Sequence, residues 1–368
     1  MRILHIIDSL SMGGAENLLI GLSSGQQNLG HDVTVKPLIC AQHTPVRDKM
    51  ESCGVKVSPF AEKGSVYNPL FIFKIMKELK KYDIVHVHLF PALYWAGFAK
   101  FFSLKKTPLV YTEHSTKNKR RNNKFLHAVD RIVYQYGYKM IIACADKALE
   151  TYVASYPTVK HVCAINNGVD TRIYKDATPY SKQELLGVSE DTFIVTMVAR
   201  FMTMKRQDTV VEALAILPSN IHAVFVGGEA NDEGLVRVKQ IVTEKGVSDR
   251  VHFLYIRKDV PRILRTSDVV IMASDYEGLS LSSIEGMAAE KPFVATNVNG
   301  LKEVVGGAGV LFENNDSESL AKILNRLSSD KDYYETIAKR CSERAKKYDI
   351  RKMVDSYIEI YKNINYGR

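Results

Sequence analysis

The sequence predicts an α/β protein built from two doubly wound, Rossmann-like domains with parallel sheets. The first observation is that short apolar, β-rich runs alternate with helical stretches of roughly 10–15 residues along most of the chain. The second is a single interruption at residues 166–179, where turn-forming residues cluster before the alternation restarts. The third is the length of 368 residues, which suits two domains of ordinary size.

The first predicted domain covers residues 1–170. Strands joined by helices of this length form right-handed βαβ units, so we expect a mainly parallel sheet. The predicted strands are residues 2–7, 33–39, 55–60, 84–88, 108–111, 140–143 and 161–165, and the predicted helices are residues 15–29, 69–79, 92–102, 124–138 and 147–155.

The second predicted domain covers residues 171–349 and repeats the same alternation. Ligands of such sheets bind at the carboxyl ends of the strands, and between two facing domains the cleft is the expected active site. The predicted strands are residues 193–198, 222–226, 251–254, 269–272, 292–295 and 310–312, and the predicted helices are residues 207–217, 235–245, 260–266, 281–289 and 317–327.

A last helix is predicted at about residues 350–364. Its apolar residues recur with the spacing of one helical stripe, which has to be buried against another element. We expect the helix to pack back on the first domain. The stripe consists of Met353, Val354, Tyr357, Ile358 and Tyr361.

The composition is that of a soluble globular protein, with 25% charged and 46% hydrophobic residues. No apolar run approaches the roughly 20 residues that span a bilayer, and the N-terminus has the pattern of a buried strand and not of a signal peptide. We therefore expect a cytoplasmic protein. The five cysteines are scattered and form no C-x-x-C pair, which disfavours a zinc site or a disulfide framework.

The net charge of +9 is concentrated in the first half, because residues 1–176 carry +10 and residues 177–368 carry −1. Aromatic residues at 89–98 and 101–102 precede the most basic stretch. Two interpretations remain open, an anionic membrane surface or a solvated face beside a core helix. No nucleic-acid-binding motif accompanies the stretch. Its basic residues are Lys100, Lys105, Lys106, Lys117, Lys119, Arg120, Arg121 and Lys124.

The most informative motif is the pair Glu277 and Glu285, which follows the predicted strand at 269–272. Ser280 stands where a helix can begin, and a helix N-terminus offers unpaired N–H groups and partial positive charge to a phosphate. A carboxylate on each side of a phosphate could hold two sets of hydroxyls, as in a nucleotide diphosphate sugar. The alternative is a surface loop followed by a charged helix face.

Two cations follow the first strand of the second domain. Arg200 and Lys205 flank a short loop, and an arginine fork together with a lysine point charge suits a pyrophosphate leaving group. An exposed basic loop is the alternative. Gly227 and Gly228 end the next strand, where small residues allow a ligand or a helix to approach.

The chain contains no Asp-x-Asp motif and no His/Asp/Glu cluster with metal-ligand spacing. We therefore expect no metal and no cofactor. Bound phosphates would be neutralised by cationic side chains and helix dipoles.

The first domain has a glycine pair and a histidine group at its predicted strand ends. Gly13 and Gly14 open the first helix, but the motif is not G-x-G-x-x-G, so a nicotinamide cofactor is disfavoured. His86 and His88 lie two apart in a strand and point the same way. His114 ends the next strand and is the preferred functional histidine, since a neutral imidazole there could donate a hydrogen bond to a sugar hydroxyl or polarise an acceptor.

Taken in order and at these spacings, the motifs resemble the retaining glycosyltransferases of family 4, which have the GT-B fold, over nearly the whole chain. The resemblance implies that Glu277 contacts the donor sugar and Glu285 the ribose, in an E-x7-E motif. Gly300 and Glu303 resemble a later G-x-x-E element, although Asn299 replaces one glycine of the usual pair. The backbone amides expected to bind phosphate are those of Gly278, Leu279, Ser280 and Leu281.

The resemblance implies further roles in both domains. His114 would contact the transferred sugar, and Arg200 and Lys205 would bind the diphosphate. The first domain would bind the acceptor and the second the nucleotide-sugar donor. The expected catalytic residues are His114, Arg200, Lys205 and Glu277; the further donor contacts include Gly13, Gly14, Gly227 and Gly228; and Glu16, His86 and His88 belong to the acceptor and sugar region.

The implied activity is metal-independent, retaining transfer of a hexose from a nucleotide diphosphate sugar, with a UDP-sugar expected. The acceptor would be lipid-linked or a glycan, in polysaccharide, capsule or lipopolysaccharide biosynthesis, and an anionic membrane surface is a further expected partner. Two alternatives are a nonhydrolysing nucleotide-sugar 2-epimerase, which would need acid and base carboxylates, and a catalytically silent sugar-nucleotide-binding subunit.

Overall fold

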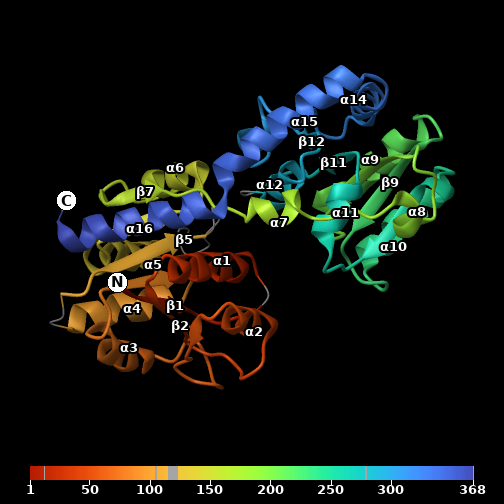
Figure 1. Ribbon diagram of the computed structural model, residues 1–368. Helices are drawn as coiled ribbons and strands as arrows, with labels where there is room; N and C mark the ends of the chain where they lie inside the picture. Colours follow the sequence, from red (N-terminus) through yellow and green to blue (C-terminus); the bar gives the residue numbers. More distant parts are fainter. Residues whose placement is uncertain (12, 104–105, 115–122, 278–279, 368) are drawn as a thin grey trace. The chain divides into compact units, whose positions relative to one another are not determined.

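The computed structural model describes residues 1–11, 13–103, 106–114, 123–277 and 280–367. The chain divides into two compact units (Figure 1), each described here by itself. The first unit comprises Met1–Gly168 together with Ile350–Arg368, and the second comprises Val169–Asp349. The last helix therefore belongs to the first unit.

The first unit contains a seven-stranded parallel sheet in the order β3-β2-β1-β4-β5-β6-β7. The inner strands are almost fully buried, as expected of parallel strands covered on both faces, whereas the two edge strands are partly exposed. The strands are β1 (Arg2–Ile7), β2 (Asp32–Pro37), β3 (Lys56–Val57), β4 (Ile84–His88), β5 (Leu109–Glu113), β6 (Met140–Ala143) and β7 (Val162–Ala164). The helices are α1 (Gly14–Asn28), α2 (Pro45–Ser52), α3 (Phe71–Leu79), α4 (Ala92–Phe102), α5 (Lys124–Ile132), α6 (Asp146–Ser155) and α16 (Ile350–Tyr366), and a π-helix spans Val133–Gly137.

Two layers of helices cover this sheet. One face packs against α1 and α16, which contact each other and share a core with residues of β1, β2, β4 and β5. Figure 1 shows α16 lying along the first unit near α1. The predicted apolar stripe of this helix, which includes Tyr357 and Tyr361, is buried. The opposite face packs against α3 and α4.

The second unit contains a six-stranded parallel sheet in the order β10-β9-β8-β11-β12-β13. Its larger core lies between this sheet and a group of helices that includes α9, α12 and α14. The strands are β8 (Phe193–Val198), β9 (Ile221–Val226), β10 (Val251–Tyr255), β11 (Val269–Met272), β12 (Phe293–Thr296) and β13 (Val310–Phe312). The helices are α7 (Thr171–Lys175), α8 (Lys182–Leu186), α9 (Gln207–Ala215), α10 (Glu233–Glu244), α11 (Val260–Thr266), α12 (Leu281–Ala288), α13 (Lys302–Val305), α14 (Ser317–Ser329) and α15 (Lys331–Ala345), with a 3-10 turn at Thr203–Lys205.

The predicted fold class, two doubly wound parallel sheets, is confirmed. Several element bounds differ from the prediction. The strand predicted at residues 55–60 is only the two-residue β3, and the helix predicted at 124–138 continues from α5 as a π-helix. Five α-helices of the described residues were not predicted, namely α2, α7, α8, α13 and α15. None of the described helices combines the length and the apolar character needed to span a bilayer.

Candidate functional site

The second unit gathers its predicted site residues at one edge of the sheet. Strands β8, β9 and β11 are neighbours and run parallel, so their carboxyl ends meet there. Arg200 follows β8, Gly227 follows β9 and Glu277 follows β11. The order of strands in the sheet therefore brings together segments that are far apart in the sequence.

Lys205 and Glu277 form an ion pair at this edge. The Lys205 ammonium donates to Glu277 Oε1 at 2.5 Å, and the Ser274 hydroxyl donates to the same oxygen at 2.8 Å. The two charged side chains are 15% and 14% exposed, so the pair is largely shielded from water. Partial burial strengthens such a pair relative to one on an open surface. The ion pair and the Ser274 hydrogen bond thus fix both side chains beside the strand ends.

The backbone around Lys205 turns sharply. Arg206 has a φ of +54°, a left-handed conformation that is uncommon for a residue with a side chain. Its guanidinium donates to Asp208 Oδ1 at 3.2 Å and lies 3.9 Å from Asp275 Oδ1. Arg200 is exposed, and its carbonyl oxygen accepts from the Gln207 amide at 3.0 Å. The loop thus presents Arg200 to solvent while it anchors Lys205.

Gly227 and Gly228 lie against the loop that carries Arg200. A Cβ atom at Gly227, where φ is +128°, would lie 2.2 Å from the carbonyl oxygen of Ala199. A Cβ at Gly228, where φ is +69°, would lie 2.6 Å from the ring of Phe201. These glycines therefore have a packing reason of their own, since any side chain would displace the loop. Their predicted contact with the donor stays a prediction.

The start of α12 is defined by a serine cap. The Ser280 hydroxyl accepts from the Ser283 N–H at 3.3 Å, and the Ser283 hydroxyl donates to the Ser280 carbonyl at 2.7 Å. Leu281 is the first residue of the helix. The predicted phosphate contacts of Gly278 and Leu279 lie outside the described residues.

Glu285 lies on α12 beside Tyr174 of the short helix α7. Burial raises the pKa of the Glu285 carboxyl. The hydrogen bond that this carboxyl receives from the Tyr174 hydroxyl lowers the same pKa, but by less. Burial and the neighbouring carboxyl also raise the pKa of Tyr174. Among the described residues Glu285 therefore contacts a neutral hydroxyl and forms no ion pair with a cation. The structure brings Glu277 together with Lys205 and Glu285 together with Tyr174.

In the first unit, the loop between β1 and α1 is acidic. Gly13 is the N-cap of α1, and the Glu16 carboxylate bends back toward it, because a Cβ on Gly13 would lie 2.3 Å from Glu16 Oε2. Ser11 donates to Glu16 at 3.1 Å. Gly14 has open space around it. Burial raises the pKa of Asp8 in the same loop to about 6. Because carboxylates repel phosphate, the start of α1 is less suited to binding phosphate than the glycine pair alone suggests.

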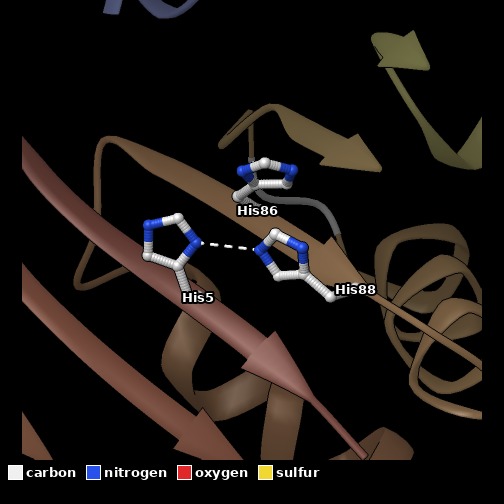
Figure 2. A group of neighbouring side chains, drawn as sticks. All are labelled: His5, His86 and His88. Atoms are coloured by element: carbon white, nitrogen blue, oxygen red, sulfur yellow. Dashed lines mark hydrogen bonds between the residues drawn. The ribbon is translucent and has the colours of Figure 1, made fainter. Parts of the chain in front are cut away.

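The histidines predicted at the strand ends lie inside the first unit. In the parallel register His5 stands opposite His86, and His88 follows two residues later on the same face (Figure 2). His5 and His86 are fully buried, and His88 is 2% exposed. His114 is only partly buried and hydrogen-bonds His88 at 3.1 Å. His114 is therefore the member of the group nearest to solvent.

Three of these histidines are close enough to suggest a metal site that spacing along the chain did not indicate. Ring nitrogens of His5, His86 and His88 all lie within 4.8 Å of one another. However, each of the six ring nitrogens already has a hydrogen-bond partner inside the unit, and a metal would have to displace some of these partners. The donor set therefore fits a hydrogen-bond network better than a metal centre. The partners of His86 are Tyr361 at 2.5 Å and Thr112 at 2.7 Å, those of His5 are Gln26 at 2.7 Å and His88 at 3.0 Å, and His88 also contacts His114.

Four residues that contact the predicted site residues of the two units were not themselves predicted. Ser274 and Tyr174 contact the two glutamates of the motif, and His5 and Gln26 extend the histidine network. His5 carried one usable signal, a polar residue inside an otherwise apolar first strand. Tyr174 carried none, because it lies in the segment that was predicted as a linker.

Two parallel-sheet units with charged loops at the carboxyl ends of their strands have the architecture of the GT-B fold, and the family matches decide which class of GT-B protein this is. Residues 12–173 match the family described as Glycosyltransferase Family 4, and residues 181–348 match the one described as Glycosyl transferases group 1. The chain belongs to the family 4 glycosyltransferases, which confirms the resemblance predicted from its motifs.

Bacterial relatives agree with this assignment, and a solved structure shares the fold. The N-acetyl-alpha-D-glucosaminyl L-malate synthase of Bacillus anthracis is 27% identical, covering 77% of this chain and 75% of the relative. The UDP-Gal:alpha-D-GlcNAc-diphosphoundecaprenol alpha-1,3-galactosyltransferase of Escherichia coli is 26% identical, covering 79% and 77%. The crystal structure of HepE from Anabaena in complex with UDP superposes with a TM-score of 0.85 at 24% identity, covering 99% and 100% of the two chains.

Proposed function

We propose that the protein transfers a hexose from a UDP-sugar to a lipid-linked or glycan acceptor, with retention of anomeric configuration and without a metal, in bacterial surface-polysaccharide synthesis. The observation that carries the proposal is the shielded Lys205–Glu277 pair at the carboxyl edge of the second sheet, with Arg200 exposed in the loop that leads to Lys205. HepE was crystallised with UDP and with UDP-glucose, and the Escherichia coli relative is named for a UDP-galactose donor and a lipid diphosphate acceptor.

In the proposed reaction the bond between the anomeric carbon and the diphosphate oxygen breaks, and the acceptor oxygen bonds to the same face of that carbon. The leaving phosphate oxygen takes the acceptor proton, so no protein base is needed. Lys205 and Arg200 stabilise the charge that develops on the diphosphate. Glu277, oriented by Lys205 and Ser274, accepts hydrogen bonds from hydroxyls of the donor sugar and does not act as a nucleophile.

The direct test is transfer from UDP-glucose, UDP-galactose and UDP-N-acetylglucosamine, in the presence of EDTA, to a polyprenyl-diphosphate-linked sugar. We expect a product with the anomeric configuration of the donor, read from the proton coupling constant, and an unchanged rate in EDTA. An inverted product, a rate abolished by EDTA, or formation of an epimer without acceptor would each refute the corresponding part of the proposal.

Glu285 is proposed to hold the ribose of the donor. We expect Glu285→Ala to weaken UDP binding by about tenfold or more, because the charge-assisted hydrogen bonds to two hydroxyls are lost. Isothermal titration with UDP measures this. The control is Glu290→Ala, just after the same helix, whose carboxylate pairs with Arg265 and Lys175 instead. Equal UDP affinity in wild type and Glu285→Ala would exclude the ribose role.

We further propose that the basic first unit associates with the anionic inner face of the cell membrane. Phe102 and Phe125 are 69% and 75% exposed, and Lys106 and Lys124 are exposed as well. The predicted cations at 105, 117 and 119–121 lie outside the described residues.

Sedimentation with phosphatidylglycerol vesicles tests the membrane proposal. We expect binding at low salt that weakens at high salt and falls several-fold in a Phe102→Ser/Phe125→Ser variant. Ile216→Ser, which removes a comparably exposed apolar side chain from the second unit, is the control. Absence of sedimentation at low salt would rule the membrane surface out.

A further inference from the structure

A continuous chain of hydrogen bonds joins three histidine rings to one glutamine inside the first unit. Gln26 Oε1 lies 2.7 Å from His5 Nε2. His5 Nδ1 lies 3.0 Å from His88 Nε2, the contact marked in Figure 2. His88 Nδ1 lies 3.1 Å from His114 Nε2. Because the rings are joined end to end, the protonation of one nitrogen determines the next.

The order of donors and acceptors along these hydrogen bonds is set by the amide of Gln26. A carbonyl oxygen can only accept, so His5 Nε2 carries the hydrogen and His5 Nδ1 is a bare acceptor. His88 Nε2 must then carry its hydrogen and donate it to His5. Because His88 Nδ1 then has no hydrogen, it accepts from His114 Nε2. The other ring nitrogen, His114 Nδ1, is therefore unprotonated and can accept a hydrogen bond.

These assignments require neutral imidazole rings with one N–H each. Burial of the rings keeps them neutral. Burial lowers the pKa of His5 and of His114 to about 4. Burial, together with the neighbouring histidines, lowers the pKa of His88 well below its ordinary value. At neutral pH all three rings are therefore uncharged.

The second branch of the network agrees with this orientation of Gln26. The Gln26 amide nitrogen lies 3.5 Å from the Tyr361 hydroxyl, which lies 2.5 Å from His86 Nδ1. Tyr361 can accept from Gln26 and donate to His86, and His86 Nε2 then donates to Thr112 Oγ1 at 2.7 Å. Donors and acceptors alternate through both branches, and each contact has one hydrogen.

We propose that Gln26 is a positioning residue for His114: its amide oxygen selects the Nε2–H tautomer of His5, and this selection passes through His88, so that His114 presents Nδ1 as a hydrogen-bond acceptor. The functional imidazole therefore receives a hydrogen bond from a sugar hydroxyl and does not donate one. This ligand role rests on the proposed function, whereas the tautomers themselves do not. No described residue hydrogen-bonds His114 Nδ1.

Two-bond ¹H–¹⁵N correlation spectra of the full chain, labelled with ¹⁵N-histidine, test the tautomers directly. Signals are assigned by comparison with variants that each lack one of the 10 histidines. We expect the Nε2–H pattern for His5, His88 and His114. An Nδ1–H pattern at any of them would overturn the inference. So would an equimolar bound zinc with loss of the Nε2–H signals of His5 and His88, since a metal takes a free nitrogen lone pair.

Variants of Gln26 test its role. Gln26→Leu removes the acceptor, and we expect His114 to lose its single tautomer and kcat/KM for the donor to fall about tenfold, the effect of one hydrogen bond. Gln27→Leu is the control on the same helix, because the Gln27 side-chain amide donates to the Gly54 carbonyl, outside the histidine network. Unchanged tautomers in Gln26→Leu would refute the role.

The result separates this inference from the proposed function. Nε2–H tautomers in a protein that does not bind or transfer a UDP-sugar would leave the network standing and refute the proposed function. Nδ1–H tautomers in an active transferase would do the reverse. Where a Gln26 variant does not fold, the wild-type spectrum by itself still decides the tautomer of each ring.

Discussion

Replacing Lys205 by alanine is expected to lower turnover at saturating UDP-sugar by about 10²–10³-fold. Removal of one preorganised charge or hydrogen-bond donor from a developing anion has an effect of this order. The change also leaves the Glu277 carboxylate, 14% exposed, with Ser274 as its remaining described hydrogen-bond donor. Steady-state kinetics with each donor measures the loss, and thermal unfolding measures the accompanying change in stability.

The second unit offers a matched control for this variant. Lys182 pairs with Asp268 at 2.8 Å, and its side chain is 15% exposed, the same as Lys205. That pair lies at the amino ends of β8 and β11, away from the proposed site. Lys182→Ala should therefore lower stability to a similar degree and leave turnover unchanged. Turnover of Lys205→Ala above a tenth of the wild-type value would show that Lys205 does not stabilise the leaving group.

A companion variant separates charge from shape at the same place. Glu277→Gln keeps the side-chain size and an acceptor oxygen for Ser274, but it removes the charge that pairs with Lys205. If Glu277 orients the donor sugar, as proposed, the variant should lose activity although it unfolds near the wild-type temperature. Loss of folding in both Lys205→Ala and Glu277→Gln would instead assign the ion pair a structural role.

Gly227→Ala is expected to cause the largest loss of stability among single methyl additions at the site. The added Cβ would lie 2.2 Å from the Ala199 carbonyl oxygen, at a φ of +128° that residues with side chains rarely adopt. Overpacking and backbone strain together suggest about 3 kcal/mol or more. For a unit of this size that corresponds to about 6–12 °C in Tm, measured by calorimetry. Displacement of the loop should also move Arg200 and reduce turnover.

Gly246→Ala separates the two causes. Gly246 has a φ of +66°, and no atom lies within 4 Å of its added Cβ. It should lose about 1–2 kcal/mol from backbone strain alone and keep full turnover. If the two variants lose the same stability, contact with the Ala199 carbonyl is not the cause, and the packing explanation for the glycine pair fails.

The parts of the fold that the sequence predicted are those whose burial leaves a strong apolar pattern. Strands of a parallel sheet covered on both faces are nearly continuous apolar runs, and β1, β8 and β11 were recognised for that reason. Helix α15 was missed although it has 15 residues, because only Ile337, Cys341 and Ala345 of it are buried. So narrow a stripe is hard to distinguish from a polar segment.

In the candidate site, too, some features were predicted from the sequence and others were not. The sequence placed Lys205 and Glu277 after the first and fourth strands of the second domain, with Lys205 expected at the diphosphate and Glu277 at the donor sugar. Their ion pair depends on β8 and β11 being neighbours, although β9 and β10 separate them in the sequence. Spacing along the chain contains no information on that adjacency, so the pair appears only in the folded unit.

The sequence by itself determined the two-domain α/β class, the family and the order of the charged motifs, because these depend on local periodicity and on short segments. Only the tertiary structure decided which side chains share a hydrogen bond. His5, Gln26 and Tyr361 come from the first strand, the first helix and the last helix, and they meet because α1 and α16 cover one face of the sheet. A network assembled from distant segments is set by strand order and helix packing, which no local pattern encodes.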